Sequence, residues 1–461
     1  MAQVTTPLKS LRCLRSFWAI GGLILGGCAS GFPLMPTPVV YTGEAAKSLF
    51  TAPAESPKSS AIELLYITDR APRGAADATA STDPEDALPY TAERSRKMAF
   101  GTVAVEFGED VDWDTLAVQS VAAERSIELD LELGETTELG RFPRLPYEIK
   151  WLPGDKFQRD PATLAQHRKA AEGLQAALAQ RLAAAPRKAL VLFVHGYANS
   201  FRDAALTMGE LCHFLGREFA CGIFTWPAGG SRGVFFGYNV DRESSEYAVL
   251  HLKQALRIVA ATPGLERLHL LAHSRGTDVL TTALQQIVIE DYAARADMGA
   301  SLKLRNLVLI APDIDVDVAV TKLFIVSSDP DLLHGDRPEP DAIMSTGELR
   351  LTIYASPDDS ALSLSEYLYG SVRRLGRADT SIYAAGIDEE ARLKQVSRLK
   401  GIDVVEVVGS SDLFGHSYFV SNPAASADLI GLIRYDLKLG DPGRPAEQIH
   451  KPFWRIGGAK R

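Results

Sequence analysis

Cysteine, long apolar runs and positive charge are all in short supply in this chain. Its 461 residues include only 4 cysteines, and no two of them form a C-x-x-C pair of the kind that binds zinc. Lys and Arg total 49 against 58 for Asp and Glu, so the net charge of −9 offers no basic face for nucleic acid. No repeat of solenoid length occurs. With 46% hydrophobic residues, the chain still has enough apolar material for a large folded core.

The N-terminal residues 1–27 have the pattern of a secretory signal. An apolar stretch at residues 17–25 is too short to span a bilayer as a permanent helix. Small residues follow it, and three cations precede it: Lys9, Arg12 and Arg15. This pattern predicts that the mature chain lies outside the cytoplasm.

The end of this signal resembles the lipobox of bacterial lipoproteins. Leu25-Gly26-Gly27 stands directly before Cys28. The resemblance implies cleavage before Cys28 and a lipid anchor on its thiol, which would hold the protein in the bacterial cell envelope. Ala29 rather than Asp follows, and by resemblance to sorted lipoproteins this favours the outer membrane, with the protein facing the periplasm. An ordinary signal or an uncleaved anchor is the alternative.

Two cysteines, Cys212 and Cys221, lie in the part of the chain that is expected to fold. In an oxidising compartment a disulfide between them would persist. Their spacing does not fix the separation of their Cα atoms, so a disulfide and two buried free thiols are both open.

The chain divides into five segments by composition. After the signal, residues 28–60 are rich in Pro, Ser and Ala and predict a flexible linker. Residues 61–186 contain strand-like runs at 62–68 and 100–107 and a helical pattern at 161–185. Residues 187–440 form the main domain, and residues 441–461 are expected to be a C-terminal tail.

In the main domain, apolar strand-like runs alternate with helical stretches. The strands are expected at residues 189–194, 222–226, 267–272, 304–310, 349–354 and 404–408. The helices are expected at residues 203–214, 242–261, 277–294, 366–375 and 424–437. This alternation predicts an α/β domain with a mostly parallel central sheet and helices on both faces.

The strongest chemical signal is the sequence Ala272-His273-Ser274-Arg275-Gly276 between a predicted strand and a predicted helix. A serine on such a tight turn forms a nucleophile elbow, which tolerates only small side chains two positions before and after it. Ala272 and Gly276 meet that requirement, although the usual first glycine is replaced. The helix N-terminus adds a positive dipole where an oxyanion would develop. We therefore expect Ser274 to be a nucleophile.

A second signal is His195-Gly196-Tyr197 after an earlier apolar strand. Acyl transfer needs two N–H donors aimed at the oxyanion, one from the residue after the nucleophile and one from such a loop. We assign the oxyanion hole to the backbones of Arg275 and Tyr197, and we expect His195 to be structural.

Together these motifs resemble the α/β-hydrolase superfamily, and more closely a bacterial family of α/β hydrolases catalogued as domain of unknown function 900. The likeness covers about residues 61–435, so the N-terminal strands are expected to extend the same sheet. It rests on residues 66–70, 93–103, 195–197, 226–227, 272–276, 311–313, 354–362 and 415–419. The resemblance implies a serine hydrolase fold with the order Ser, acid, His, and it implies no cofactor.

In this fold the catalytic histidine follows the last strand of the sheet. Three histidines follow Ser274 in the chain: His334, His416 and His450. His334 precedes a predicted strand, and His450 lies beyond the last predicted helix. His416 stands just after the strand at 404–408, so we expect it to be the general base.

The acid that orients the histidine is less well defined. Asp359 follows the strand at 349–354, and the resemblance favours it because of the Ser-x-x-Asp-x-Ala-Leu pattern. Asp358 is next in line, and Asp313 competes because some members of the superfamily place the acid one strand earlier. Asp313, Asp315 and Asp317 do not match a calcium loop, because Val318 stands where such a loop needs glycine. We therefore expect no metal.

The expected activity is cleavage of a carboxylic ester, from a small-molecule or lipid-like substrate, through an acyl-enzyme. The loop at residues 327–346 is polar and lacks the apolar stretch of a lipase lid, which disfavours an interfacial lipase. Two alternatives are an acyltransferase with the same triad and a non-catalytic envelope lipoprotein that uses the scaffold for binding.

Overall fold

The computed structural model describes most of the chain. The described residues are 31–50, 59–74, 89–230, 233–294, 296, 298–323, 349–369, 374–377, 401–409 and 415–457. The predicted signal, Cys28 and the loop at 327–346 lie outside them. No helix in these ranges combines the length and the apolar character needed to cross a membrane.

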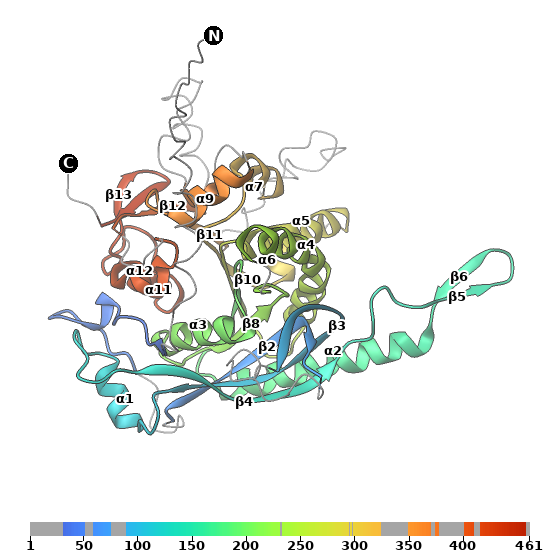
Figure 1. The fold of residues 1–461 in the computed structure, drawn as a ribbon, viewed down its shortest axis with the longest axis horizontal. Helices are drawn as coiled ribbons and strands as arrows, with labels where there is room; N and C mark the ends of the chain where they lie inside the picture. Colours follow the sequence, from blue (N-terminus) through green and yellow to red (C-terminus); the bar gives the residue numbers. More distant parts are fainter. Residues whose placement is uncertain are drawn as a thin grey trace, which may run out of the picture.

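A large twisted sheet forms the centre of the molecule (Figure 1). Its described strands follow the order β1-β4-β3-β2-β8-β7-β9-β10-β11-β12-β14-β13. From β2 to β14 neighbouring strands run parallel, and antiparallel strands stand at both ends. The strands are β1 Phe32–Pro33, β2 Ala61–Pro72, β3 Tyr90–Phe107, β4 Asp130–Arg141, β7 Ala189–Val194, β8 Ala220–Thr225, β9 Arg267–His273, β10 Leu304–Ile310, β11 Arg350–Ala355, β12 Ile402–Val407, β13 Glu447–His450 and β14 Phe453–Ile456.

Helices cover both faces of this sheet, because its central strands are apolar on both sides. In β7 every residue is buried: Leu190 and Leu192 face one apolar core, and Val191 and Phe193 face the other. The first core is shared with α2 (Pro161–Ala184), α4 (Gly233–Ala260) and α5 (Gly276–Ala293), and the second with α3 (Phe201–Phe214) and α12 (Pro423–Ile433). The prediction of a mostly parallel sheet with helices on both faces and extra N-terminal strands is confirmed.

Helix starts follow from local chemistry. The side chain of Asp160 accepts a hydrogen bond from the Thr163 N–H before α2, and Pro161 supplies the fixed φ of a first helical residue. Ser200 and Asp203 form a reciprocal capping box at α3. The remaining helices are α1 Trp113–Gln119, α6 Met298–Ser301, α7 Val316–Leu323, α9 Ser360–Tyr369 and α11 Tyr418–Ser421, with 3-10 turns at Val39–Tyr41 and Leu375–Arg377.

The predicted linker at residues 28–60 is wrong for residues 31–50. This segment packs against the main domain, with Leu34, Met35 and Tyr41 buried. The Tyr41 hydroxyl donates to the Phe214 carbonyl over 2.6 Å, and the Met35 N–H donates to a carboxyl oxygen of Glu210 over 2.9 Å. Prolines suit such an extended segment, while the apolar residues between them supply the burial. Residues 51–58 of this stretch lie outside the described residues.

The predicted tail at residues 441–461 also contains sheet structure. Strand β14 pairs parallel to β12, and β13 pairs antiparallel to β14 at the edge. Phe453 and Trp454 are buried there. A four-residue strand is too short to give a clear period-2 pattern, so the sequence alone does not identify its apolar residues as part of a sheet.

One predicted helix is displaced. The sequence pattern predicts a helix at residues 366–375, whereas α9 begins at Ser360 and ends at Tyr369. Its first turn is fixed by Asp359, whose Oδ1 accepts a hydrogen bond from the Leu362 N–H over 2.9 Å.

The disulfide was one of two possibilities left open by the sequence. Cys212 on α3 and Cys221 on β8 are bonded to each other, with their Cα atoms 6.2 Å apart. The bond ties a covering helix to the strand beside it.

Candidate active site

Ser274 occupies a strained turn between β9 and α5. Its φ is +52°, a left-handed conformation that costs energy for a residue with a side chain. The Ser274 N–H donates to the Ile310 carbonyl over 2.9 Å, which ties the turn to the end of β10. A Cβ on Gly276 would collide with the His195 carbonyl and lie 2.6 Å from that of Val194. A residue without a side chain is therefore required two positions after the serine, because the end of β7 approaches closely there.

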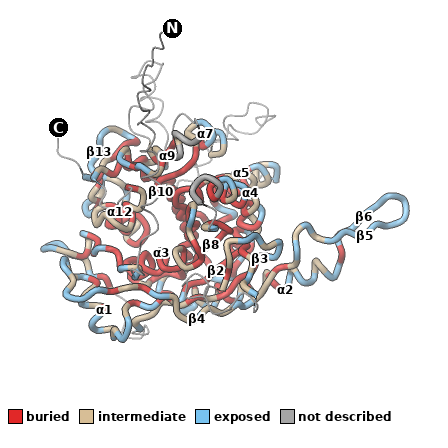
Figure 2. The backbone as a smooth tube through the Cα atoms, viewed as in Figure 1, coloured by how far each residue is buried: buried red, intermediate tan, exposed pale blue. Residues whose placement is uncertain are grey.

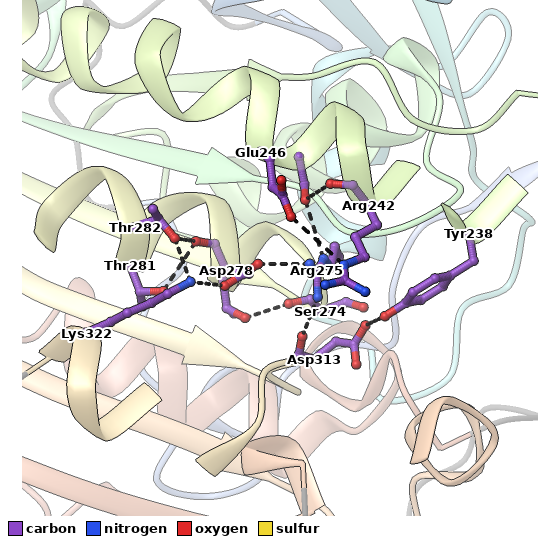
Figure 3. A network of polar contacts seen from close by, with 12 residues as sticks. Tyr238, Arg242, Glu246, Ser274, Arg275, Asp278, Thr281, Thr282, Asp313 and Lys322 are labelled. Carbon is purple, nitrogen blue, oxygen red and sulfur yellow. Dashed lines mark hydrogen bonds and ion pairs between the residues drawn. The ribbon is translucent and has the colours of Figure 1, made fainter. Parts of the chain in front are cut away.

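Charged side chains fix the start of α5 around this serine (Figure 3). A guanidinium nitrogen of Arg275 lies 2.9 Å from Asp278 Oδ2, and Lys322 Nζ lies 2.5 Å from Asp278 Oδ1. Arg275 also donates to the Asp313 carbonyl over 3.4 Å. The side chain of Arg275 is held by these contacts, so the predicted oxyanion-hole role concerns only its backbone N–H.

His416 and Asp359 form a short contact. His416 Nδ1 lies 2.6 Å from Asp359 Oδ2, and the Asp359 side chain is fully buried. Since Asp359 Oδ1 accepts from the Leu362 N–H, both carboxylate oxygens have donors. A carboxylate at Nδ1 favours the tautomer with a proton there, which leaves Nε2 as the acceptor that a general base needs.

His273 connects this histidine to the elbow. The rings of His273 and His416 have centroids 4.7 Å apart, and His273 Nε2 lies 3.2 Å from the His416 carbonyl oxygen. Burial lowers the pKa of His273 to about 3, so its ring is neutral. A neutral ring can contact a carbonyl only through its N–H, so His273 donates. The residue before Ser274 thus holds the backbone of His416.

The two alternative acids have other surroundings. Asp313 is buried, accepts a hydrogen bond from the Tyr238 hydroxyl over 2.7 Å, and lies 3.3 Å from Arg374 Nε. Asp358 is exposed and accepts from the Gly409 N–H over 3.3 Å. Of the three candidates, Asp359 is the one with a described contact to the His416 ring.

The loop after β7 lies directly over the elbow. A Cβ placed on Gly196 would lie 2.6 Å from Ser274 Cβ and 3.2 Å from its Oγ. Asp241 holds this loop, since it accepts hydrogen bonds from the Ala198 N–H over 3.1 Å and the Gly229 N–H over 3.2 Å. The backbone of Tyr197, between two fixed residues, is therefore beside the serine.

His195 is a structural residue of this loop. Its ring is fully buried and stacks on Trp226 with an interplanar angle of 8°. The Trp226 N–H donates to His195 Nε2 over 3.1 Å, so Nε2 is an acceptor and Nδ1 donates to the Gly196 carbonyl over 2.9 Å. Burial and the nearby Arg70 hold the pKa of His195 well below its usual range.

The sequence reasoning missed Arg70 and His273 as site residues. Arg70 is almost fully buried and donates to the carbonyls of Asn199 over 2.6 Å and Ala228 over 2.9 Å, so it braces the loop that covers Ser274. The available signal was an arginine at the end of an apolar strand, which needs partners if buried. For His273 the signal was its place beside Ser274, the predicted nucleophile.

The described residues offer no obvious metal centre. No three of their His, Cys, Asp and Glu side chains gather in a way that would hold an ion. Asp315, part of the aspartate run considered for calcium, instead accepts hydrogen bonds from the N–H groups of Asp317 and Val318 at the start of α7.

This arrangement agrees with the comparison to known families. Residues 170–433 match the family model described as alpha/beta hydrolase of unknown function (DUF900). The chain belongs to this family. The resemblance inferred from the motifs is confirmed for these residues, and the α/β-hydrolase fold with it. No curated protein matches the chain. As a member of an α/β-hydrolase family, the protein is expected to be a hydrolase.

Proposed function

We propose that this hydrolase is a serine esterase that cleaves carboxylic esters through Ser274, His416 and Asp359. The observation that carries the proposal is the 2.6 Å contact of His416 Nδ1 with the buried Asp359, next to an elbow whose serine has φ +52°. A strained backbone at a serine lowers the stability of the fold. Such strain is typical of catalytic sites, where it presents the nucleophile to a neighbouring base.

In the proposed reaction, His416 Nε2 takes the proton of Ser274 Oγ as that oxygen attacks the ester carbonyl carbon. The imidazolium that results is stabilised by the Asp359 carboxylate. The oxyanion receives hydrogen bonds from the backbone N–H groups of Tyr197 and Arg275. Collapse of the intermediate expels the alcohol, which takes the proton from His416 and leaves an acyl group on Ser274.

Water then releases the acyl group from Ser274, with His416 acting first as the base and then as the acid. His416 removes a proton from water, the hydroxide attacks the acyl carbonyl, and Ser274 leaves with the returned proton. The products are a carboxylic acid and an alcohol, and the protein is regenerated.

Labelling with a fluorophosphonate probe tests this proposal. We expect the probe to modify Ser274, located by peptide mass spectrometry, and we expect Ser274→Ala and His416→Ala to abolish labelling. Ser356→Ala is a matched control, because Ser356 is a buried serine near Asp359 whose hydroxyl makes no hydrogen bond to any of the described residues. A folded wild-type protein that does not react with the probe would contradict the proposal and favour a binding role.

We also propose that the mature protein is held in the outer membrane by a lipid on Cys28. The support is the sequence pattern before that cysteine, because residues 1–30 lie outside the described residues. Metabolic labelling with an alkyne fatty acid should tag the wild-type protein and not Cys28→Ala, and membrane fractionation should place the tagged protein with the outer membrane. Equal tagging of both forms would refute lipidation at Cys28.

A further inference from the structure

A small hairpin stands apart from the main body of the protein. Strands β5 (Ile149–Leu152) and β6 (Lys156–Arg159) form a separate two-stranded sheet before α2. Figure 1 shows this ribbon projecting beyond the N-terminal end of α2, and Figure 2 shows it exposed along its length. Every residue of both strands is exposed. The ribbon therefore lies in solvent in the isolated chain.

The hairpin carries large apolar side chains that the described part of the chain leaves mostly exposed. Trp151 is 70% exposed and Phe157 is 63% exposed. The two residues are cross-strand partners with ring centroids 5.8 Å apart. Ile149, two residues before Trp151, is on the same face of the ribbon. An isolated pair of strands is only marginally stable in water. Burial of these rings against another apolar surface would therefore stabilise the hairpin.

The hairpin is also locally basic in an acidic protein. Lys150, Lys156 and Arg159 lie on its strands, with Asp155 in the turn. The chain as a whole has a net charge of −9. Residues 141–169 carry Arg141, Arg144, Lys150, Lys156, Arg159, Arg168 and Lys169 against Glu148, Asp155 and Asp160. An anionic surface would attract this region and repel most of the rest of the protein.

The cations are distributed over both faces of the ribbon. Arg159 is the cross-strand partner of Ile149 on the aromatic face, and Lys156 lies on the opposite face. Lys150 also lies on the opposite face, where its Nζ is 2.6 Å from Asp160 Oδ1. A groove on a protein contacts one face of an inserted ribbon. The headgroup layer of a membrane surrounds it, so phosphates can reach cations on both faces while the rings enter the acyl boundary.

We propose that this hairpin inserts into the headgroup region of an anionic lipid bilayer, with Trp151 and Phe157 buried and with Lys156 and Arg159 on phosphate groups. Aromatic rings with flanking cations are the side chains that favour this layer. The insertion is independent of the catalytic residues and requires no lipid on Cys28.

Fluorescence that is local to Trp151 tests this proposal on the full chain. Vesicles contain phosphatidylglycerol and phosphatidylethanolamine, with dibrominated acyl chains as the quencher. The chain has 5 tryptophans, so the signal of Trp151 is obtained by subtracting the spectrum of Trp151→Phe from that of the wild type. The subtraction cancels the fluorescence of the other 4 tryptophans. We expect this difference signal to shift to the blue and to be quenched. The readout does not depend on how the N-terminus is held.

Charge and apolar variants separate the two parts of the interaction. Lys156→Gln with Arg159→Gln should weaken insertion about 30-fold, because each cation near an anionic surface contributes about fivefold. Phe157→Ser should reduce the quenching as well. Leu250→Ser with Ile289→Ser is the matched control, since both are exposed apolar residues elsewhere on the protein, and it should leave the signal unchanged.

Two outcomes would overturn the proposal. One is a Trp151 signal that stays unquenched in anionic vesicles while the protein is folded. The other is a signal that shifts with protein concentration in the absence of vesicles, together with a dimer that Phe157→Ser disrupts. That second result would assign the hairpin to a contact between copies of the chain.

Discussion

The exchange of Asp359 for Asn tests the proposed site most directly. The carboxylate is fully buried and lies 2.6 Å from His416 Nδ1, so its charge is not screened by solvent. Asn has the same shape, but it presents an amide instead of a full negative charge. If its NH2 group faces Nδ1, the imidazole proton moves to Nε2, and the ring can no longer accept the proton of Ser274. If its oxygen faces Nδ1, the imidazolium has lost its counter-charge.

The expected loss is large. Removal of the corresponding charge from serine hydrolase triads lowers the rate about 10⁴-fold, which corresponds to about 5 kcal/mol of transition-state stabilisation. The rate constant for fluorophosphonate labelling or for hydrolysis of an activated ester measures it. The fold should survive when the NH2 group faces Nδ1, because the Asn oxygen then still accepts from the Leu362 N–H at the start of α9. The opposite orientation places the NH2 group against that N–H and is disfavoured.

The two other acids provide the controls. Asp358→Asn changes an exposed side chain and should leave the rate within about twofold. Asp313→Asn weakens the contacts to Tyr238 and Arg374 and should cost about 1–3 kcal/mol of stability with a smaller loss of rate. A rate that falls 10⁴-fold in Asp313→Asn and less than tenfold in Asp359→Asn would refute the assignment of the acid.

Four further predictions concern stability and positioning. Replacing both Cys212 and Cys221 by Ser removes the disulfide between α3 and β8 and should lower the free energy of unfolding, measured in urea, by about 2–3 kcal/mol. Equal urea midpoints for the variant and the wild type would show that the disulfide does not stabilise the fold. Burial raises the pKa of Glu210 to about 8, so the folded protein holds a proton that the unfolded chain releases above about pH 5. The free energy of unfolding should therefore fall by about 1 kcal/mol per pH unit between about pH 5 and pH 8, and denaturation curves of Glu210→Gln should lack this pH dependence. Gly276→Ala should prevent folding or labelling, as seen by circular dichroism and probe reaction, because its Cβ meets the His195 carbonyl. His273→Phe removes the donor to the His416 carbonyl and should slow labelling about five- to tenfold at an unchanged melting temperature. An unchanged rate would remove His273 from the positioning residues.

The sequence was most informative where one short segment carries both a structure and a chemistry. The apolar run before Ser274 and the small residues around it predict a strand, a turn and a helix, and the structure has β9, the φ +52° turn and α5 in that order. The proximity of His416 and Asp359 depends on how β11 and β12 pair, which no local pattern contains. Family resemblance supplied that placement, and the catalytic roles stay predictions until the labelling experiments test them.

The sequence was least informative where burial depends on distant partners. The residues around Tyr41 are predicted to be a linker because prolines and small residues dominate their composition. Their order comes from contacts that lie far along the chain: Arg434 donates to the Tyr41 hydroxyl over 2.8 Å and lies 2.6 Å from a Glu218 carboxylate oxygen. Composition indicates how much apolar surface a segment can bury. It does not indicate which surface of the folded domain is complementary to that segment.

This correction changes what a lipid on Cys28 would do. A flexible tether of residues 28–60 would let the hydrolase domain move far from the membrane. Strand β1 starts at Phe32 instead, and the four residue steps from Cys28 to Phe32 span at most about 14 Å. A lipid on Cys28 would therefore hold the β1 edge of the sheet at the bilayer surface, since β1 follows directly. The N-terminal end of the sheet and the projecting hairpin would then form two separate contacts, and their combined effect on membrane binding would exceed either alone.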